Sequence, residues 1–182
     1  MSSLPPSTLS MAQQREALWA DAGHRVYAVI VGAKVPGLRE QLATADVDGW
    51  DGLWTGELDD AERAAAPLLV TLKKESPFTE WLLAEAAQSF AGWGALALGK
   101  LPFLAMRSHG RALCRAQLPN GQAIRIDWMD PEVMEALLPV ASADMLQRVY
   151  AGFDMLVTLQ PGQWTRWSVQ GAGLVRTTSG VQ

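Results

Sequence analysis

The sequence predicts an α/β fold in which a mixed β-sheet is flanked by helices, with at least one antiparallel hairpin and a short C-terminal extension. Two near-continuous apolar runs, at residues 25–31 and 93–98, have the length of buried strands. Ser or Asp followed by Pro marks the start of two helices, at residues 76–77 and 130–131. Strand and helix signals therefore alternate along most of the chain.

The N-terminal part begins with a segment, residues 1–9, that we expect to be a frayed tail. Ser10 and Gln13 have the capping-box spacing and predict a short helix that ends near residue 20. Residues 25–31 are rich in β-branched side chains and predict a buried strand. A Pro-Gly pair then breaks the chain before a short amphipathic helix at residues 38–42.

The middle of the chain continues the alternation. Residues 51–55 and 67–72 predict two short strands. Ser76 and Pro77 predict the start of a helix, because Ser caps a free N–H and Pro at the first helical position lacks one. The second apolar run ends shortly before Pro102, which opens a further helix to about residue 110.

The clearest local signal is a hairpin. Residues 113–118 and 122–127 alternate apolar and polar side chains, and Asn120-Gly121 lies between them. Asn-Gly favours a turn in which both central residues have φ > 0, so we expect that conformation at Asn120 and Gly121.

Two helices are predicted after the hairpin. Asp130 caps and Pro131 begins the first, which Pro139 ends, and Ser142 caps the second. The side chains that we expect to face inward from these helices are Met134, Leu137, Leu138, Met145 and Val149.

The C-terminal part predicts a closing hairpin. Residues 153–159 and 163–170 form the two runs, and Pro161-Gly162 supplies the turn. Gly171 and Gly173 are expected to loosen the tail that follows. The predicted organisation is thus an N-terminal tail and short helix (1–22), an α/β core (23–152), and a C-terminal hairpin and tail (153–182).

Composition excludes several classes of protein. Of 182 residues, 49% are hydrophobic and 19% charged, which supports a packed core and excludes a disordered chain. The net charge of −4 and the lack of a basic stripe argue against nucleic-acid binding. No apolar run is long enough to span a bilayer, and residues 1–14 lack the features of a signal peptide. We therefore expect a cytoplasmic protein without membrane insertion.

Charge is concentrated in an acidic segment, residues 40–62. It contains eight carboxylates and no Lys or Arg. The segment is either a solvated surface or a face that steers a basic partner.

Motifs for phosphate or calcium binding are incomplete. Residues 94–100 fit the first part of a phosphate-binding loop, but Leu101 stands where Ser or Thr would hold the metal ion. Residues 46–57 have the outline of a calcium loop, but Trp50 replaces an oxygen ligand and Asp51 replaces the Gly of the sharp turn. We expect neither a cofactor nor a metal ion.

A catalytic set is hard to assemble from the remaining residues. His109 lies five positions before the single Cys, Cys114, and could act with Cys114 or Asp127 in a small hydrolase or transferase. His109 near the end of a helix is explained more simply by the helix dipole. No catalytic residue is therefore predicted, and the enzyme stays an alternative.

Tryptophan is unusually frequent, with eight Trp against four Phe and two Tyr. Trp164 and Trp167 lie at odd spacing on one predicted strand and so point to opposite faces. We expect at least one of them to face outward or to meet another chain; a tail that folds back and buries both is the alternative. Because Trp and Arg dominate binding hot spots, we predict a partner-binding set, comprising Trp50, Trp54, Arg125, Trp128, Trp164, Arg166 and Trp167.

The order of these segments resembles a known family. Several motifs carry the resemblance: Arg25 to Ala33 over the first strand and the two residues after it, the Pro36-Gly37 helix start, Ser76-Pro77-Phe78 with Trp81-Leu82, Leu118-Pro119-Asn120-Gly121-Gln122, Arg125, and Asp130-Pro131 with Val133-Met134 and Leu137-Leu138-Pro139. This pattern, from about residue 27 to 150, is similar to the effector-adaptor (chaperone) family of bacterial type VI secretion systems. Its most specific part is the hairpin that leads into the Asp-Pro helix.

The resemblance implies a non-enzymatic cytoplasmic adaptor that holds a secreted toxic effector and helps to load it onto the spike protein. The chain departs from the family at Val31, where Asp is common, and at Met129, where an aromatic is frequent. The shared residues Asn120, Gly121, Asp130 and Pro131 have structural tasks in turns and caps. An immunity protein that blocks a toxin is a further alternative, because it has the same acidic profile.

Overall fold

The computed structural model describes residues 8–171 and 173–181 and confirms a mixed sheet flanked by helices. Eight strands form the main sheet in the order β1-β10-β9-β8-β5-β2-β4-β3. Neighbouring strands are antiparallel except β1 and β10, which are parallel. In chain order these strands are β1 (Thr8–Leu9), β2 (Arg25–Ile30), β3 (Gly49–Gly52), β4 (Leu68–Thr71), β5 (Gly94–Gly99), β8 (Met155–Gln160), β9 (Gln163–Gln170) and β10 (Gly173–Val181).

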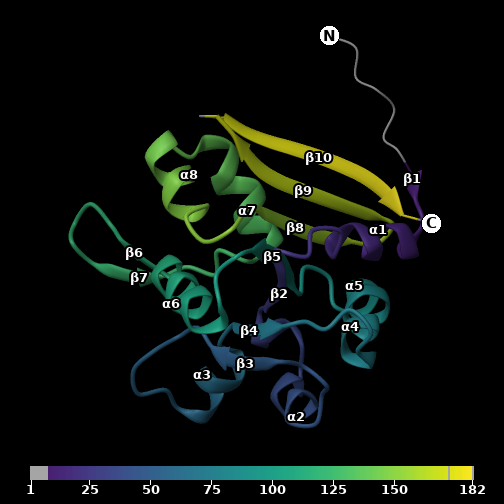
Figure 1. Ribbon diagram of the computed structural model, residues 1–182. Coiled ribbons are helices and arrows are strands. Elements are labelled where there is room, and N and C mark those ends of the chain that lie inside the picture. Colours follow the sequence, from purple (N-terminus) through teal and green to yellow (C-terminus); the bar gives the residue numbers. More distant parts are fainter. Residues whose placement is uncertain (1–7, 172, 182) are drawn as a thin grey trace.

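Helices cover both faces of the sheet, and a separate hairpin projects from one side (Figure 1). The hairpin consists of β6 (Arg115–Gln117) and β7 (Ala123–Arg125). The helices are α1 (Met11–Leu18), η1 (Gly32–Lys34), α2 (Leu38–Leu42), α3 (Asp60–Ala65), α4 (Pro77–Trp81), the π-helical η2 (Leu82–Ala86), α5 (Ala87–Ser89), α6 (Phe103–Leu113), α7 (Pro131–Leu137), η3 (Leu138–Val140) and α8 (Ala143–Val149).

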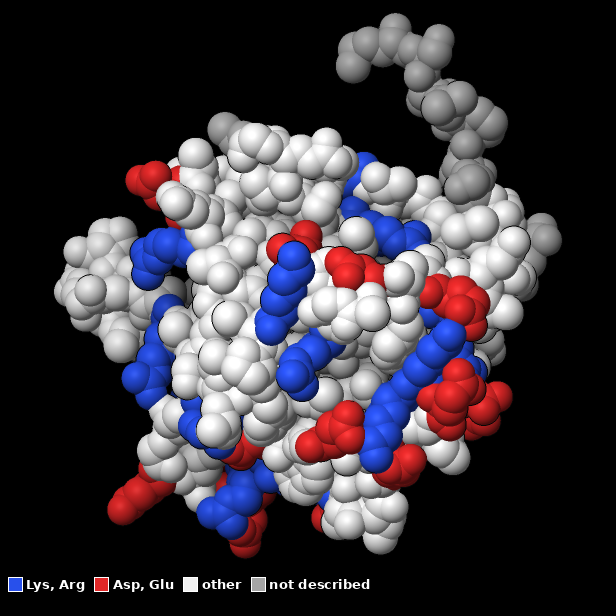
Figure 2. Space-filling view, in the orientation of Figure 1, with Lys and Arg blue, Asp and Glu red and all other residues white. Residues whose placement is uncertain are grey.

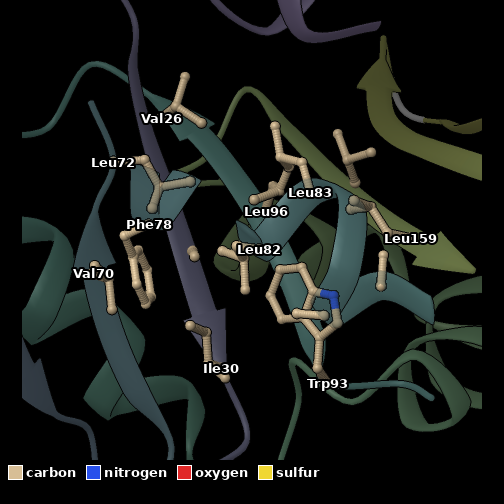
Figure 3. Close-up of a cluster of buried hydrophobic side chains, with 14 of the residues drawn as sticks. Val26, Ile30, Val70, Leu72, Phe78, Leu82, Leu83, Trp93, Leu96 and Leu159 are labelled. Carbon is tan, nitrogen blue, oxygen red and sulfur yellow. The ribbon is translucent and has the colours of Figure 1, made fainter. Parts of the chain in front are cut away.

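Alternation along the central strands builds two apolar cores. On β2, Val26, Ala28 and Ile30 belong to one core, and the residues between them belong to the other. The first-face core packs under α1, α2, α4 and η2, and Figure 3 shows part of it, with Leu82 and Trp93 between strand side chains. The second-face core packs under α6, α7 and α8. Because both faces are covered, the central strands are apolar on both sides, as the continuous runs predicted.

The helix starts follow the predicted capping chemistry. Ser10 and Gln13 form a reciprocal capping box on α1. Ser76 caps α4, Asp130 caps α7 and Ser142 caps α8, each through a side-chain oxygen that accepts a backbone N–H.

The hairpin forms where predicted, but its turn differs. Gly121 has φ +85°, whereas Asn120 does not have a positive φ. Gly121 N–H donates to Leu118 O over 2.9 Å, and Leu118 N–H donates to Gln122 O over 2.9 Å. Pro119 explains the difference, because its fixed φ suits the second position of a type I turn, after which a left-handed Gly rejoins the strands.

Two segments are more ordered than the sequence predicted. The glycines at 171 and 173 do not loosen the tail: residues 173–180 pair with β9 along eight residues. The expected N-terminal tail lies outside the described residues up to position 7, and Thr8–Leu9 forms β1 beside β10. The β-branched side chains of β10 and the turn at Gly171 (φ +60°) make this third C-terminal strand possible.

The closing hairpin of β8 and β9 continues the sheet of the core. β8 pairs with β5, so β8, β9 and β10 extend the sheet of the core. Gly94, at the start of β5, is required by close packing, because a Cβ there would lie 2.0 Å from Val29 O. The segment that partly matched a phosphate-binding loop is thus an interior strand.

Candidate functional site

An open apolar groove lies beside the hairpin. It has a volume of about 700 Å³ and runs between the C-terminal end of α6, strand β6, α7 and α8. Apolar side chains supply most of its lining, including Leu113, Ile126, Val133, Leu137, Met145 and Val149. The hairpin therefore forms one wall, and the pair α7 and α8 forms the other.

The wall made by α7 and α8 leaves large apolar side chains in solvent. Leu137 is 43% exposed and Met145 is 50% exposed, and both line the groove. Val140 of η3, which joins the two helices, is 79% exposed. The prediction that Leu137 and Met145 face inward is wrong, because the hairpin stands away from these helices and leaves the groove open. Clustered exposed apolar side chains mark interaction sites on monomeric proteins.

The floor of the groove is rigid. Trp128 is buried, its Nε1–H donates to Gly110 O over 3.2 Å, and its ring packs 5.2 Å from that of Phe153. Gly110 also allows α6 to pack closely on Leu53, because a Cβ there would lie 3.2 Å from the Leu53 side chain. Trp128 was predicted to be an exposed partner contact; it is instead the buried support of the groove.

The cap of α7 fixes the position of the helical wall. Asp130 Oδ1 accepts from Glu132 N–H over 3.0 Å, and Asp130 Oδ2 lies 2.8 Å from Lys34 Nζ. One carboxylate thus caps the helix and joins it to η1, which follows β2. The structural role predicted for Asp130 and Pro131 agrees with this geometry.

The charge along the groove is one-sided. Among its described lining residues there is no Asp or Glu, whereas Arg115 and Arg148 are present. On the face shown in Figure 2, Lys and Arg atoms lie between the uncharged hairpin tip and the rest of the molecule. The groove is therefore basic although the chain carries a net charge of −4.

The predicted residues Trp54 and Arg125 come together next to the hairpin. The guanidinium of Arg125 lies 4.8 Å from the Trp54 ring centroid and 3.0 Å from Glu62 Oε1. Arg115 donates to Thr55 Oγ1. These contacts join the hairpin to the acidic segment, and cation–π pairs of this kind stabilise modestly at exposed sites.

The acidic segment is largely paired within the molecule. Asp51 Oδ2 lies 2.6 Å from Arg107 Nη1 and 3.2 Å from Arg111 Nη2 on α6. Other carboxylates of the segment pair or cap as follows: Asp46 and Asp48 with Lys73, Asp60 with Arg63, Glu62 with Arg125, and Asp59 as the cap of α3. The carboxylates in these pairs are between 40% and 102% exposed, so the segment is a solvated surface on which several carboxylates are paired with neighbouring cations.

Trp164 and Trp167 do point to opposite faces, but neither is exposed. Trp164 is 1% exposed in the first-face core, and Trp167 is 0% exposed in the second-face core. The guanidinium of Arg176, the residue paired with Trp167 on β10, lies 4.9 Å from its ring. The expected outward tryptophan is therefore wrong, because the core under α1 includes Trp164, the core under α7 and α8 includes Trp167, and β10 continues the sheet beside β9.

Arg166 is also an internal contact. Its guanidinium donates to Gln14 Oε1 of α1 and, over 3.2 Å, to Ser179 Oγ of β10. Burial lowers the pKa of Arg166. Arg166 thus joins α1 to β10, and it does not line the groove. Trp50, by contrast, stays half-buried under the guanidinium of Arg39 at 5.7 Å and does not line the groove.

The residues considered for catalysis are held in structural contacts. His109 Nε2 lies 2.8 Å from Val149 O, so this nitrogen carries the proton and donates it, and its ring packs 4.8 Å from that of Phe153. Burial raises the pKa of Cys114 to about 12, which keeps it a neutral thiol. Burial also raises the pKa of Asp127, against the opposing effect of Trp54. A nucleophile–base pair requires the reverse: an activated thiol and an available imidazole.

Residues 8–171 and 173–181 contain no cluster of three His, Cys, Asp or Glu side chains that could hold a metal ion. Within the same residues, no helix combines the length and the apolar character needed to cross a membrane.

The fold and the groove define an α/β domain with a two-faced sheet and an open apolar groove beside a projecting hairpin. The chain belongs to the DUF4123 family, described as a domain of unknown function, which matches residues 26–148. The matched region includes the hairpin, α7, nearly all of α8 and all the lining residues of the groove except Val149 and Leu156. No curated protein and no solved structure matches the chain.

Proposed function

We propose that this protein is a non-enzymatic cytoplasmic adaptor that binds a type VI secretion effector in the groove and helps to load it onto the spike protein. The observation that carries the proposal is the groove itself: a volume of about 700 Å³ with large apolar side chains left in solvent. The segment order that resembles the effector-adaptor family lies within the same region of the chain.

The open groove leaves apolar side chains in contact with water, which costs free energy. Leu137 and Met145 expose apolar surface that a stable monomer would gain by burying, at about 25 cal/mol per Å². The walls around them are nevertheless well held, by the cap at Asp130 and the buried Trp128. A rigid apolar groove that stays open binds a partner without the entropic cost of ordering its own walls.

The chemistry of the neighbouring residues supports binding rather than a reaction. His109 donates to a backbone carbonyl, and the pKa of the Cys114 thiol is raised to about 12. An adaptor acts by stoichiometric binding and requires neither group to react.

Co-expression with an effector and a spike protein of a type VI secretion system, from the same genome, tests the proposal. We expect one complex that contains all three proteins after affinity purification. Leu137→Asp is expected to release the effector, because a carboxylate on the groove wall opposes an apolar ligand. Leu104→Asp is the matched control, since Leu104 is 63% exposed on α6 and does not line the groove. Failure to capture either partner contradicts the proposal.

Truncated effectors separate an adaptor from an immunity protein. An adaptor is expected to retain a fragment of the effector that lacks the toxic domain. Binding to the isolated toxic domain alone, with loss of its toxicity, would instead identify an immunity protein.

A further inference from the structure

We infer that the partner enters the groove as an extended segment that adds a third strand to β6, with apolar side chains in the groove and acidic side chains beside Arg115 and Arg148. The inference rests on the proposed function, because it names how the cargo occupies the same groove. It is carried by three observations: the register of the hairpin, the position of β6, and the charge of the lining.

The register of the hairpin determines which backbone groups of β6 are free. Ile126 N–H donates to Cys114 O over 3.0 Å, and Leu118 N–H donates to Gln122 O over 2.9 Å. Hydrogen-bonded and non-hydrogen-bonded pairs alternate in an antiparallel ladder, so the N–H and C=O groups of Arg115 and Gln117 point away from β7.

These outward groups lie at the groove. All three residues of β6 line it, whereas Ala123 is the only residue of β7 that does so. In residues 8–171 and 173–181, no backbone group bonds the main chain of Arg115 or Gln117 on that side. β6 is thus an open edge strand that faces an apolar groove, and open edges accept an added strand.

The opposite wall suits the side chains of such a strand. Alternate side chains of an extended segment point to one side, about 7 Å apart. Leu137 and Met145 belong to separate helices across the groove from β6 and offer exposed apolar surface to that row. Main-chain hydrogen bonds would supply the affinity, and the apolar row would supply the specificity.

The charge of the groove lining favours a partner segment that carries acidic side chains. Arg148 is exposed on α8 and makes no ion pair within the described residues. Arg115, on the other wall, donates to a hydroxyl and not to a carboxylate. Because the described lining residues include these two arginines and no Asp or Glu, the lining favours a carboxylate on the bound segment.

A peptide selection tests the inference independently of any effector. Random peptides of about eight residues, a common strand length, are selected on the full-length protein, and the recovered peptides are synthesised. We expect apolar residues at alternate positions and Asp or Glu between or beside them. N-methylation of every second amide is expected to abolish binding in one register and to be tolerated in the other, because only one set of amides faces β6.

A matched pair of protein variants tests whether a peptide binds to the open edge of β6. Gln117→Pro removes the outward N–H without removing a ladder hydrogen bond of the hairpin, and Gln117→Ala retains that N–H. Both variants lose the Gln117 side chain, which donates to Gly121 O over 3.0 Å. We expect Gln117→Pro to weaken peptide binding about tenfold or more, and Gln117→Ala to weaken it far less. Arg148→Glu is expected to weaken binding, whereas Arg25→Glu, outside the groove, is not.

Several outcomes would overturn the inference: recovery of helix-forming peptides only, recovery of no peptide, equal effects of both N-methylation registers, or equal binding by the two Gln117 variants. Failure of the proposed function is separate from these. A peptide that binds with the expected register dependence supports the strand site even if no effector co-purifies. If the Gln117→Pro variant captures an effector as well as wild type does, the adaptor function is supported and the strand site is rejected.

Discussion

The two faces of the sheet differ in how completely their helices cover them. On the first face, α1, α2, α4 and η2 lie close against the strands, and their large apolar side chains are buried or partly buried. On the second face, the hairpin stands away from α7 and α8, as Figure 1 shows. All the exposed large apolar side chains of the described residues lie on the elements of the second face, namely Leu104, Leu118, Leu137, Val140 and Met145.

The two faces of one sheet thus separate the residues that stabilise the fold from those that we expect to bind a partner. The same strands supply both cores, and β2 alone contributes alternate residues to each. The first face completes its packing within the chain, whereas the second face leaves the groove open. Substitutions in the first-face core are therefore expected to unfold the protein, and substitutions at the groove rim to affect binding with the fold intact.

The largest expected effect is on the first face. Trp164→Ala removes a fully buried ring and is expected to lower the free energy of unfolding by about 3–5 kcal/mol. Urea unfolding measures the change. Trp50→Ala is the control, because Trp50 is half-buried at the edge strand β3. A loss no larger than that of Trp50→Ala would mean that the first face is not the main source of stability.

An intermediate effect is expected at the start of α7, the helical wall of the groove. Asp130→Ala removes the cap and the ion pair with Lys34, and is expected to lower the free energy of unfolding by about 1–2 kcal/mol. Asp130→Asn retains a capping oxygen and is expected to recover most of that loss. Identical thermal unfolding of Asp130→Ala and wild type would contradict this role.

Beneath the groove, Asp127 is expected to make stability depend on pH. Burial raises its folded-state pKa above the ordinary value of 3.8, so the folded protein binds this proton more tightly than the unfolded chain does. The free energy of unfolding therefore falls as pH rises from 3.8 through the raised pKa, and the loss persists at neutral pH. Relative to Asp127→Asn, wild type should gain stability on acidification through that window. An unchanged difference between the two proteins across the window would exclude this assignment.

The smallest expected effect on stability is at the groove rim. Met145→Asp changes a half-exposed side chain and is expected to shift the free energy of unfolding by less than about 0.5 kcal/mol. The same variant is expected to lose the effector. If this substitution unfolded the protein, the rim would belong to the core. The two faces would then not differ in how completely they are packed.

Much of the fold follows from local chemistry in the sequence. Ser10, Ser76, Asp130 and Ser142 begin helices because a side-chain oxygen near a free backbone N–H is a short-range signal. The apolar runs become interior strands for the same reason: their composition suits burial on both sides.

The groove could not be predicted in this way. Periodicity indicates which side of a helix is apolar but not whether another element covers it, so Leu137 and Met145 were expected to be buried. Conversely, the sequence predicts that at least one of Trp164 and Trp167 faces outward, because it gives no signal for β10. Its glycines suggested a loose tail, whereas long-range pairing with β9 decides its conformation. Both errors concern contacts between distant parts of the chain.

Hydrogen–deuterium exchange of the protein alone and in complex with its effector tests the central claim most directly. We expect added protection in β6, α7 and α8, because these elements line the groove. Exchange in α1, α2 and α4 is expected to stay unchanged, since the first face is already closed. Added protection over α1, α2 and α4, with none in β6, α7 and α8, would contradict the claim that the second face is the binding face.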